Sequence, residues 1–151
     1  MTFTLFYDKI LIGDIMKNRS EIREDAMKVL YQVYILSTSN LEYDIPSLIK
    51  EQNEVENDFL NDLVNGCIKY EKEITALADK YLENWSLDRL NKVDKAIFCI
   101  GIYELVYTKT PCVVAINEAL ELSKKYSDEK VTKMLNGVLD NIFHNEEIQG
   151  E

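Results

Sequence analysis

The segment Lys92–Tyr107 is apolar on nearly every side when it is wound as a helix. Its sequence is Lys-Val-Asp-Lys-Ala-Ile-Phe-Cys-Ile-Gly-Ile-Tyr-Glu-Leu-Val-Tyr. Such a helix is either a core helix or a membrane span, and Lys95 and Glu104 bound a run too short to cross a bilayer. The segment is therefore predicted to be the central helix of an all-α bundle. Gly101 predicts a close crossing with another helix, because a glycine inside a helix otherwise costs about 1 kcal/mol relative to alanine.

Helical periodicity continues on both sides of this segment, with apolar side chains recurring at intervals of three and four residues. Six further helices are expected, and they include residues 21–36, 47–52, 55–67, 74–82, 113–123 and 128–142. The N-caps expected for four of them are Ser20, Asn53, Thr110 and Ser127. Five glycines and two prolines leave room for short loops and little room for strands. An all-α fold of seven helices without a sheet is therefore predicted.

The two ends of the chain differ from the helical part. Residues 1–15 are apolar and partly alternating, lack a basic leading region, and are too short for a membrane span. They are expected to be an N-terminal extension, either disordered or an added strand, and Met16 is interpreted as a native start. Residues 16–145 are expected to form one helical domain. Residues 146–151 are expected to be a frayed acidic tail.

The chain is acidic, with a net charge of -10, but the acids are unevenly placed. Residues 40–83 carry eleven acidic side chains and four lysines, whereas residues 17–34 and 109–134 each carry one more basic than acidic side chain. A net charge of this sign does not favour nucleic-acid binding, but these last two parts are spared the excess of acid and could share a face. The three cysteines are widely spaced at apolar positions. They predict buried thiols in a reducing cytoplasm, and no disulfide framework or zinc site.

An enzyme is not expected. The single histidine, His144, leaves little scope for nucleophile–base pairs or histidine-rich metal sites, and no glycine-rich phosphate loop is present. Two carboxylate pairs, Glu54 with Asp58 and Glu118 with Glu121, share helix faces and could in principle do acid–base work. They are better interpreted as solvated surface. No catalytic residue, cofactor or metal is therefore predicted, and binding is the expected role.

Cations lie near an aromatic ring in the first predicted helix. Arg19, Arg23 and Lys28 interleave with Tyr31, a pattern that occurs in proteins that hold single-stranded RNA. Scattered surface cations beside a packed tyrosine would give the same pattern, so periodicity alone leaves both explanations open. Trp85 is interpreted as a core anchor and not as an RNA contact.

Several ordered motifs carry a family resemblance. They are Ala115-Ile-Asn-Glu-Ala-Leu-Glu-Leu-Ser-Lys-Lys-Tyr, Lys133-Met-Leu-Asn-Gly-Val-Leu-Asp, Asn84-Trp-Ser-Leu-Asp-Arg-Leu, and the Val-Asp-Lys-Ala and Tyr103-Glu-Leu of the central helix. Together they closely resemble the signature of the NusB family of bacterial transcription antitermination factors. The resemblance runs from about Arg19 to Phe143. It implies an all-helical fold of two three-helix bundles that meet along a long central helix.

The resemblance implies a function within a complex and no catalysed reaction. Members of the family pair with NusE, a small-subunit ribosomal protein, in the antitermination complex of RNA polymerase. Together the two proteins grip the boxA element of nascent RNA, chiefly in ribosomal RNA leaders. The RNA-contacting positions of the family fall here on Arg19, Arg23, Tyr31 and Met134. We add, from proximity and charge, Lys28, Lys130 and Lys133.

Two departures from the family pattern predict weak RNA binding by the protein alone. The first helix has one cation fewer than the usual arginine-rich run and an acid at Glu21. Met134 stands where many relatives have phenylalanine, and stacking of a base on an aromatic ring is worth about 1–3 kcal/mol. NusE is expected to supply much of the positive charge, and the acidic segment from Glu54 to Glu83 offers it a complementary surface. The alternative is a NusB-like interaction scaffold with weak or lost RNA binding, or a free homodimer that covers its own RNA face.

Overall fold

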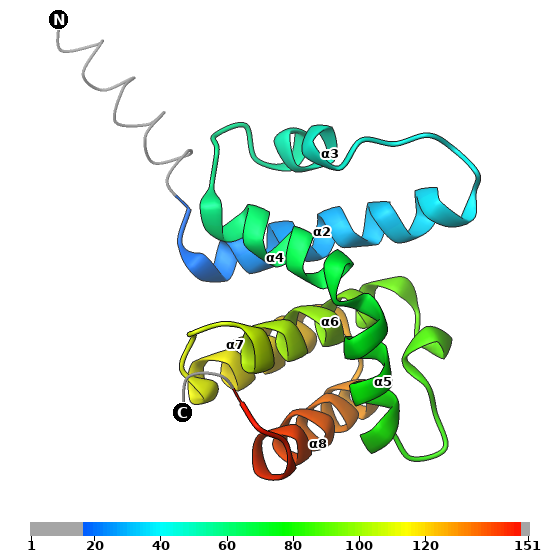
Figure 1. The fold of residues 1–151 in the computed structure, drawn as a ribbon, viewed down its shortest axis with the longest axis vertical. Helices are drawn as coiled ribbons and strands as arrows, with labels where there is room; N and C mark the ends of the chain where they lie inside the picture. The colour runs from blue at the N-terminus through cyan, green and yellow to red at the C-terminus, as the bar shows by residue number, and fades with distance from the viewer. Residues whose placement is uncertain (1–16, 149–151) are drawn as a thin grey trace, which may run out of the picture.

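The computed structural model describes residues 17–148 (Figure 1). Within them the chain forms seven α-helices, one short 3₁₀ helix and no β-strand. In chain order they are α2 (Arg19–Thr38), α3 (Ile45–Gln52), α4 (Asp58–Lys69), α5 (Glu71–Tyr81), η1 (Leu87–Arg89), α6 (Lys92–Tyr107), α7 (Cys112–Tyr126) and α8 (Glu129–Asn145). The predicted all-α fold of seven helices without a sheet is confirmed for this part of the chain. The expectations for residues 1–15 and for residues 149–151 lie outside the described residues.

Helix α6 has the predicted bounds and lies at the centre of the core. Every residue from Ala96 to Leu105 is buried, and α6 packs against α2, α4, α5, α7 and α8. The predicted close crossing occurs at Gly101. A Cβ at this position would lie 2.9 Å from the Cβ of Ala119 in α7 and 3.5 Å from the methyl groups of Leu139 in α8. The absence of a side chain at Gly101 therefore lets α6 and α7 approach closely.

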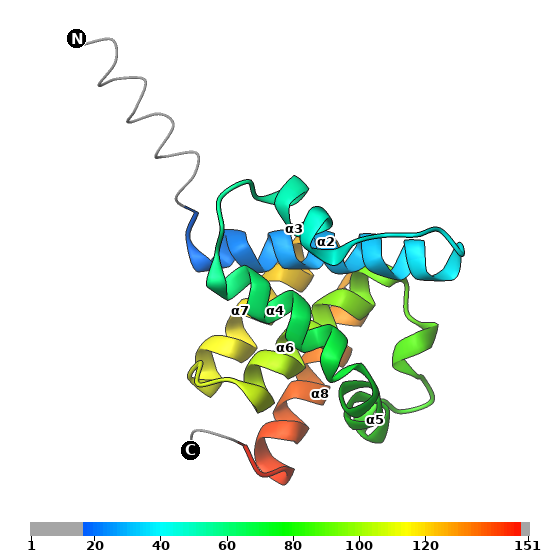
Figure 2. The ribbon, with the colours of Figure 1, turned by 45° about the horizontal axis from the view of Figure 1, so that its top comes forward.

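The helices form two packed groups that meet along α6 (Figure 1). Helix α2 packs against α3 and α4 in the first group, whereas α5, α7 and α8 pack with α6 in the second. Helices α4 and α5 follow one another with a bend, because Tyr70 is both the C-cap of α4 and the N-cap of α5 (Figure 2). This arrangement agrees with the two bundles along a central helix that the family resemblance implied.

Helix α2 is buried along most of its length because other helices cover it from two sides. Towards α3, the buried carboxylate of Asp25 accepts hydrogen bonds from Lys17 at 2.8 Å and from Gln52 at 3.3 Å. The opposite side packs against α6 and α7. Lys28 and Tyr31 lie on the exposed part of the helix that remains. The first helix is therefore a core element with a narrow accessible surface.

The N-caps of α2 and α8 differ by one or two residues from those predicted. Asn18, and not Ser20, caps α2, and Asp128, and not Ser127, caps α8. Each capping side chain accepts a hydrogen bond of 2.9 Å from the backbone N–H three residues further on. The two serine hydroxyls instead donate to carboxylates of other helices. Since asparagine, aspartate and serine cap about equally well, tertiary partners decided between them.

Two further helix starts also differ from the prediction. Asn57 caps α4, while Asn53 ends α3 and donates its side-chain N–H to the carbonyl of Val55 at 2.9 Å. Val55, predicted on the buried stripe, therefore precedes α4 and is 40% exposed. Pro111 occupies the N-cap of α7 and not its first helical position, so Thr110 lies just outside the helix. The helical stripes were predicted better than the residues that start them.

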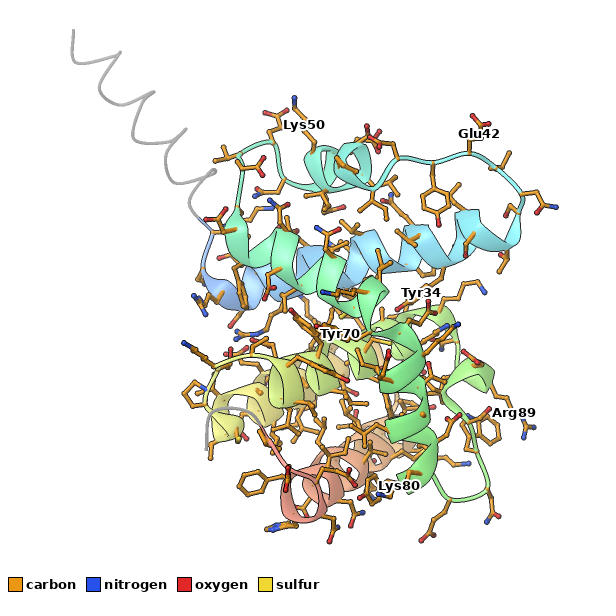
Figure 3. All side chains as sticks on the ribbon, in the orientation of Figure 1. Tyr34, Glu42, Lys50, Tyr70, Lys80 and Arg89 are labelled. Atoms are coloured by element: carbon orange, nitrogen blue, oxygen red, sulfur yellow. The ribbon has the colours of Figure 1, made fainter. Side chains whose placement is uncertain are left out.

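The predicted acidic tail is held at its first residue. Glu146 is the C-cap of α8, and its carboxylate accepts a hydrogen bond of 2.7 Å from Nζ of Lys80 in α5. Figure 3 shows Lys80 on α5. The Tyr81 hydroxyl donates to the same carboxylate oxygen. The expectation of fraying from Glu146 onwards is therefore corrected at this residue, because α5 supplies partners that the linear sequence does not reveal.

Candidate nucleic-acid interface

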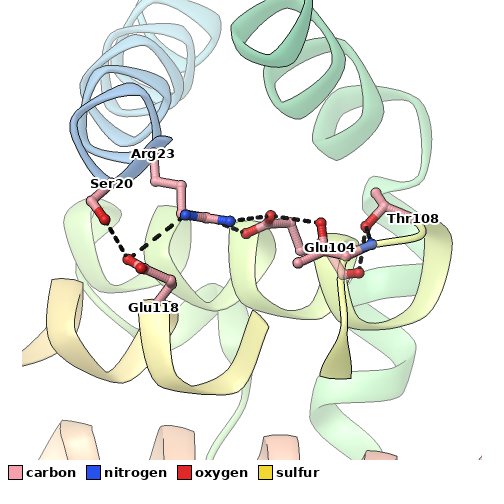
Figure 4. A network of polar contacts seen from close by, with 6 residues as sticks. Ser20, Arg23, Glu104, Thr108 and Glu118 are labelled. Carbon is pink, nitrogen blue, oxygen red and sulfur yellow. Dashed lines mark hydrogen bonds and ion pairs between the residues drawn. The ribbon is translucent and has the colours of Figure 1, made fainter. Parts of the chain in front are cut away.

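The Arg23 side chain, predicted to contact RNA, lies in the interior of the protein (Figure 4). The residue is 3% exposed, and its guanidinium forms a two-pronged ion pair with the carboxylate of Glu104 in α6, which is 1% exposed. Nε lies 2.7 Å from Oε2, and Nη2 lies 2.8 Å from Oε1. Both charges are satisfied without solvent, as burial requires. The expectation of Arg23 as a surface cation is corrected, because α6 covers α2 at this point and neutralises the charge.

The Arg23–Glu104 pair belongs to a larger cluster that joins α2, α6 and α7 (Figure 4). Glu118 of α7 lies 3.7 Å from Arg23 Nη1 and accepts a hydrogen bond of 2.9 Å from the Ser20 hydroxyl. The Thr110 hydroxyl donates to Glu104 at 3.2 Å. We call these five residues the interhelix polar cluster. The cluster joins the first helix group to the second, and the Arg23 guanidinium is used in these internal contacts.

Arg19 remains exposed at the first residue of α2. Its guanidinium carbon lies 4.4 Å from the centroid of the Phe59 ring in α4, and that of Arg23 lies 5.1 Å from the same centroid. Arg19 and Tyr31 are separated by about 18 Å along the helix axis and by roughly 120° around it. Arg19 and Tyr31, both predicted to contact RNA, therefore do not lie on one face of α2.

A different set of cations and rings surrounds the exposed part of α2. Glu24, Lys28 and Tyr31 follow one another at spacings of four and three, which places them on one helix face. Tyr31 is 39% exposed, and Lys28 Nζ lies 3.8 Å from Glu24 Oε1. At the end of α7, Lys125 Nζ lies 2.9 Å from Glu24 Oε2, and the Tyr126 hydroxyl donates to Glu24 Oε1. We call these five residues the α2–α7 strip.

Lys125 and Tyr126 were not predicted as site residues, although both lie in the strip. Burial raises the pKa of Glu24, but hydrogen bonds from Lys125 and Tyr126 outweigh it and hold the pKa below its ordinary value. Glu24 is therefore charged at neutral pH and partly neutralises its cationic neighbours. The run Lys124-Lys125-Tyr126 was visible in the sequence. Cations are also favoured at any helix C-terminus, however, so the run carried no specific signal.

A second set of predicted residues lines a groove beside α8. Lys130, Lys133 and Met134 line it from α8, and Trp85 lines it from the connection between α5 and η1. The groove encloses about 620 Å³. Lys133 Nζ lies 3.4 Å from Glu129 Oε1, whereas Lys130 forms no ion pair with another residue of the described chain. We call this feature the α8 groove, and it keeps three of the predicted RNA contacts together.

The interpretation of Trp85 as a core anchor is wrong, since the residue is 41% exposed. Its neighbours Leu82 and Leu87 are buried in its place, at 8% and 0% exposure. Asn84, just before the tryptophan, has a φ of 57°, in the left-handed region that asparagine tolerates better than most residues. This turn directs the leucines inwards and leaves the indole at the surface. An apolar side chain in a turn therefore gave a misleading signal of burial.

The α2–α7 strip and the α8 groove meet at the connection between α7 and α8. Tyr126 ends α7, while Asp128 caps α8 and lines the groove. Between them, the Ser127 hydroxyl donates a hydrogen bond to the buried carboxylate of Asp94 in α6. Burial raises the pKa of Asp94, and the bond from Ser127 opposes that shift. This contact anchors the connection to the core, so the strip and the groove hold fixed positions relative to one another.

Other predicted features can be placed within residues 17–148. No helix in this range has both the length and the apolar character needed to span a membrane. The same residues contain no group of three or more His, Cys, Asp or Glu side chains that could hold a metal ion. Cys67 and Cys99 are buried, as predicted, whereas Cys112 is only partly buried. Burial raises the pKa of the Cys67 and Cys99 thiols, that of Cys99 to about 11.

A fold of seven helices with α6 at its centre, which carries lysines and exposed aromatic rings at the α2–α7 strip and the α8 groove, defines a helical binding protein of a kind suited to single-stranded nucleic acid. Comparison with known families narrows this class. The model of the NusB family matches residues 20–144. The chain belongs to the NusB family.

Curated relatives agree with this assignment. The transcription antitermination protein NusB of Listeria innocua is 38% identical over 125 residues, which cover 82% of this chain and 94% of the relative. The protein of the same name from Pediococcus pentosaceus is 40% identical over 128 residues, which cover 83% of this chain and 96% of the relative. The chain is thus a transcription antitermination factor of this family and not an enzyme.

Solved structures show the same fold. T. maritima NusB superposes with a TM-score of 0.74 and 29% sequence identity, over 86% of this chain and 93% of the other. A structure described as antitermination factors NusB and NusE in complex with dsRNA gives a TM-score of 0.69 and 29% identity, over 83% of this chain and 96% of the matched chain. The fold that the sequence motifs implied is therefore confirmed.

Proposed function

We propose that this antitermination factor binds boxA-type single-stranded RNA, such as that of ribosomal RNA leaders, together with the ribosomal protein NusE. The observation that carries the proposal is the surface made by the α2–α7 strip and the α8 groove, in which lysines lie beside exposed aromatic rings. Such surfaces hold single strands through phosphate neutralisation and base stacking. The similar structure that contains NusB, NusE and dsRNA supports the joint binding of RNA with NusE.

The residues predicted to contact RNA take different roles in this proposal. Tyr31 offers an exposed ring on which a base can stack, and Met134 packs at the edge of the α8 groove. The residues proposed to neutralise phosphates are Lys28, Lys130 and Lys133, with Arg19 at the far end of α2. Arg23 is proposed to act as a positioning residue that holds α2 against α6, because its guanidinium is already bound to Glu104.

The acidic part of the chain is the proposed contact for NusE. Its exposed carboxylates around α4 and α5 include those of Glu54, Glu56, Asp58, Asp62 and Glu73. A basic ribosomal protein complements such a surface and would add the cations that this chain lacks. We further propose that the heterodimer works in the cytoplasm as part of the antitermination complex of RNA polymerase.

An electrophoretic shift assay with boxA RNA, with NusE present and absent, tests the proposal. We expect the heterodimer to bind boxA more tightly than a scrambled RNA and more tightly than this chain alone. The salt slope should be about -2 to -3, for roughly three or four neutralised phosphates of a single strand. Tyr31→Ala should weaken binding about 5- to 150-fold. Tyr43→Ala, which removes another 39% exposed ring from the α2–α3 connection, should have no effect.

Two results would contradict the proposal. If RNA affinity depended neither on the boxA sequence nor on Tyr31, the proposed RNA-binding surface would be wrong. If NusE binding did not weaken with added salt, the acidic contact surface would be wrong, because screening reduces attraction between exposed charges.

A NusB-like scaffold with weak or lost RNA binding is the second candidate function. Two observations favour it: Arg23 is buried in an ion pair, and Glu24 neutralises part of the charge of Lys28 and Lys125. A scaffold would still bind NusE but would shift no RNA in its presence. A homodimer that covers its own RNA face would instead elute at twice the monomer mass in size-exclusion chromatography and release RNA binding on dilution.

A further inference from the structure

Trp85 is the single tryptophan of the chain, and it is exposed on a turn that is firmly held. The backbone N–H of Leu87, two residues later, donates to Asp79 Oδ1 of α5 at 2.7 Å. Leu82 and Leu87 anchor the turn in the core on either side of the indole. The exposure of Trp85 is therefore a fixed feature of the surface.

A fixed, exposed indole forgoes the stabilisation that burial of so large an apolar ring provides. Tryptophan is enriched at binding interfaces, because its ring combines a large apolar face with an N–H donor. One part of this ring already has a partner, since the guanidinium carbon of Arg89 lies 4.7 Å from the ring centroid. Figure 3 shows Arg89 at the outer edge of the second helix group, on the connection that precedes α6. The stacked cation supports the ring in its exposed position.

The same indole lines the α8 groove opposite the start of α8. The residues that line the groove also include Lys130 and Lys133, the asparagines Asn84 and Asn141, and the acids Glu83 and Asp128. At about 620 Å³, it lies within the range of roughly 300–1,000 Å³ that is typical of small-ligand sites. An aromatic face, lysines and amides with both donors and acceptors are the groups that recognise an unpaired nucleotide.

We propose that Trp85 is the platform on which a nucleobase of the bound RNA stacks in the α8 groove, with Lys130 at the adjoining phosphate. The inference rests on the proposed function and deepens it, because it names the subsite for one unpaired base. Met134 in the same groove has no ring. Trp85 supplies the aromatic face that the thioether of Met134 lacks. A base can therefore stack in the groove although Met134 stands there.

Intrinsic fluorescence provides the direct test, since this chain has one tryptophan. The heterodimer with NusE is titrated with boxA RNA and with an abasic oligonucleotide of the same length, and the Trp85→Phe heterodimer gives the background from NusE. We expect boxA RNA to quench the emission and the abasic strand to leave it unchanged. In a parallel anisotropy titration, Trp85→Ala should weaken RNA binding about 5- to 150-fold, whereas Trp85→Phe should stay close to the parent.

The possible results distinguish a failure of this inference from a failure of the proposed function. RNA binding that is unchanged in Trp85→Ala, together with unquenched emission, overturns the inference and leaves the proposed function standing. Failure of the parent heterodimer to bind boxA RNA overturns both. Weaker binding of NusE to Trp85→Ala without RNA would assign the groove to the protein partner and also overturn the inference. Should Trp85→Ala unfold in thermal melts, the quenching of the parent protein and the affinity of Trp85→Phe decide the question.

Discussion

At the scale of single residues, Glu24 sets the charge of the surface proposed to bind RNA. Its carboxylate holds Lys125 and the Tyr126 hydroxyl by hydrogen bonds and lies 3.8 Å from Lys28 Nζ. Any phosphate that reaches these lysines must compete with it. The same residue therefore orders two cations and lowers their net attraction for RNA.

Glu24→Gln should tighten RNA binding by the NusE heterodimer about 2- to 5-fold, because exposed ion pairs contribute about 0.2–1 kcal/mol each. The salt slope should steepen by up to about 1.4, since two lysines become free for phosphates. Filter binding over a salt series measures both quantities. Glu121→Gln is the matched control, because Glu121 lies 3.2 Å from Lys124 in an exposed pair away from Tyr31. Equal effects of the two substitutions would show that only total charge matters.

At the scale of helices, close crossings depend on glycines that the sequence marks unequally. Gly101 stood out because it interrupts an apolar helix, whereas Gly66 lies in an ordinary amphipathic pattern. A Cβ at Gly66 would nevertheless lie 2.0 Å from Cζ of the Tyr103 ring. That ring is 5% exposed and its hydroxyl donates to Asp62 at 2.8 Å. Helix α4 therefore approaches α6 at Gly66 because no side chain separates the backbone from the ring.

Gly66→Ala should destabilise the protein by about 1–3 kcal/mol, the usual effect of overpacking a close contact. Gly137→Ala should have the opposite sign and add about 0.5–1 kcal/mol, because no atom lies within 4 Å of a Cβ there and alanine favours the helix. Urea unfolding curves of the two variants and the parent give the free energies. A stabilising effect at Gly66 would mean that the Tyr103 ring can move aside without loss.

At the scale of the whole molecule, the interhelix polar cluster joins the two helix groups. The Arg23–Glu104 pair within it is almost fully buried, so each charge depends on the other. Removing one partner of such a pair typically costs about 3–5 kcal/mol, whereas replacing both by apolar residues is often close to neutral. The cluster therefore makes the relative placement of α2, α6 and α7 sensitive to a single substitution.

Glu104→Ala should lower the free energy of unfolding by about 3–5 kcal/mol, and the double variant Arg23→Met with Glu104→Leu should recover most of that loss. Urea unfolding measures the stability of each variant. The double variant also tests the positioning role of Arg23, because it should bind boxA RNA with NusE about as well as the parent. If a stable double variant bound RNA much more weakly than the parent, Arg23 would be an RNA contact and not only a positioning residue.

The candidate site was predicted only in part. Lys28, Tyr31, Lys130, Lys133 and Met134 were named from charge and resemblance, and the structure places them at the α2–α7 strip and the α8 groove. Their contact with RNA stays a proposal. Lys125, Tyr126 and Trp85 were missed, because each looked like an ordinary helix end or a core residue.

The sequence by itself determined the all-α class, the bounds of α6, the close crossing at Gly101 and the family. These features depend on local periodicity, on the absence of a side chain and on ordered motifs, all of which are present in the linear chain. Tertiary structure alone decided which charges face solvent. The partner of Arg23 lies 81 positions away at Glu104, and that of Glu24 lies 101 positions away at Lys125. A cation is free or neutralised according to what folding brings beside it, and spacing along one helix carries no record of that neighbour.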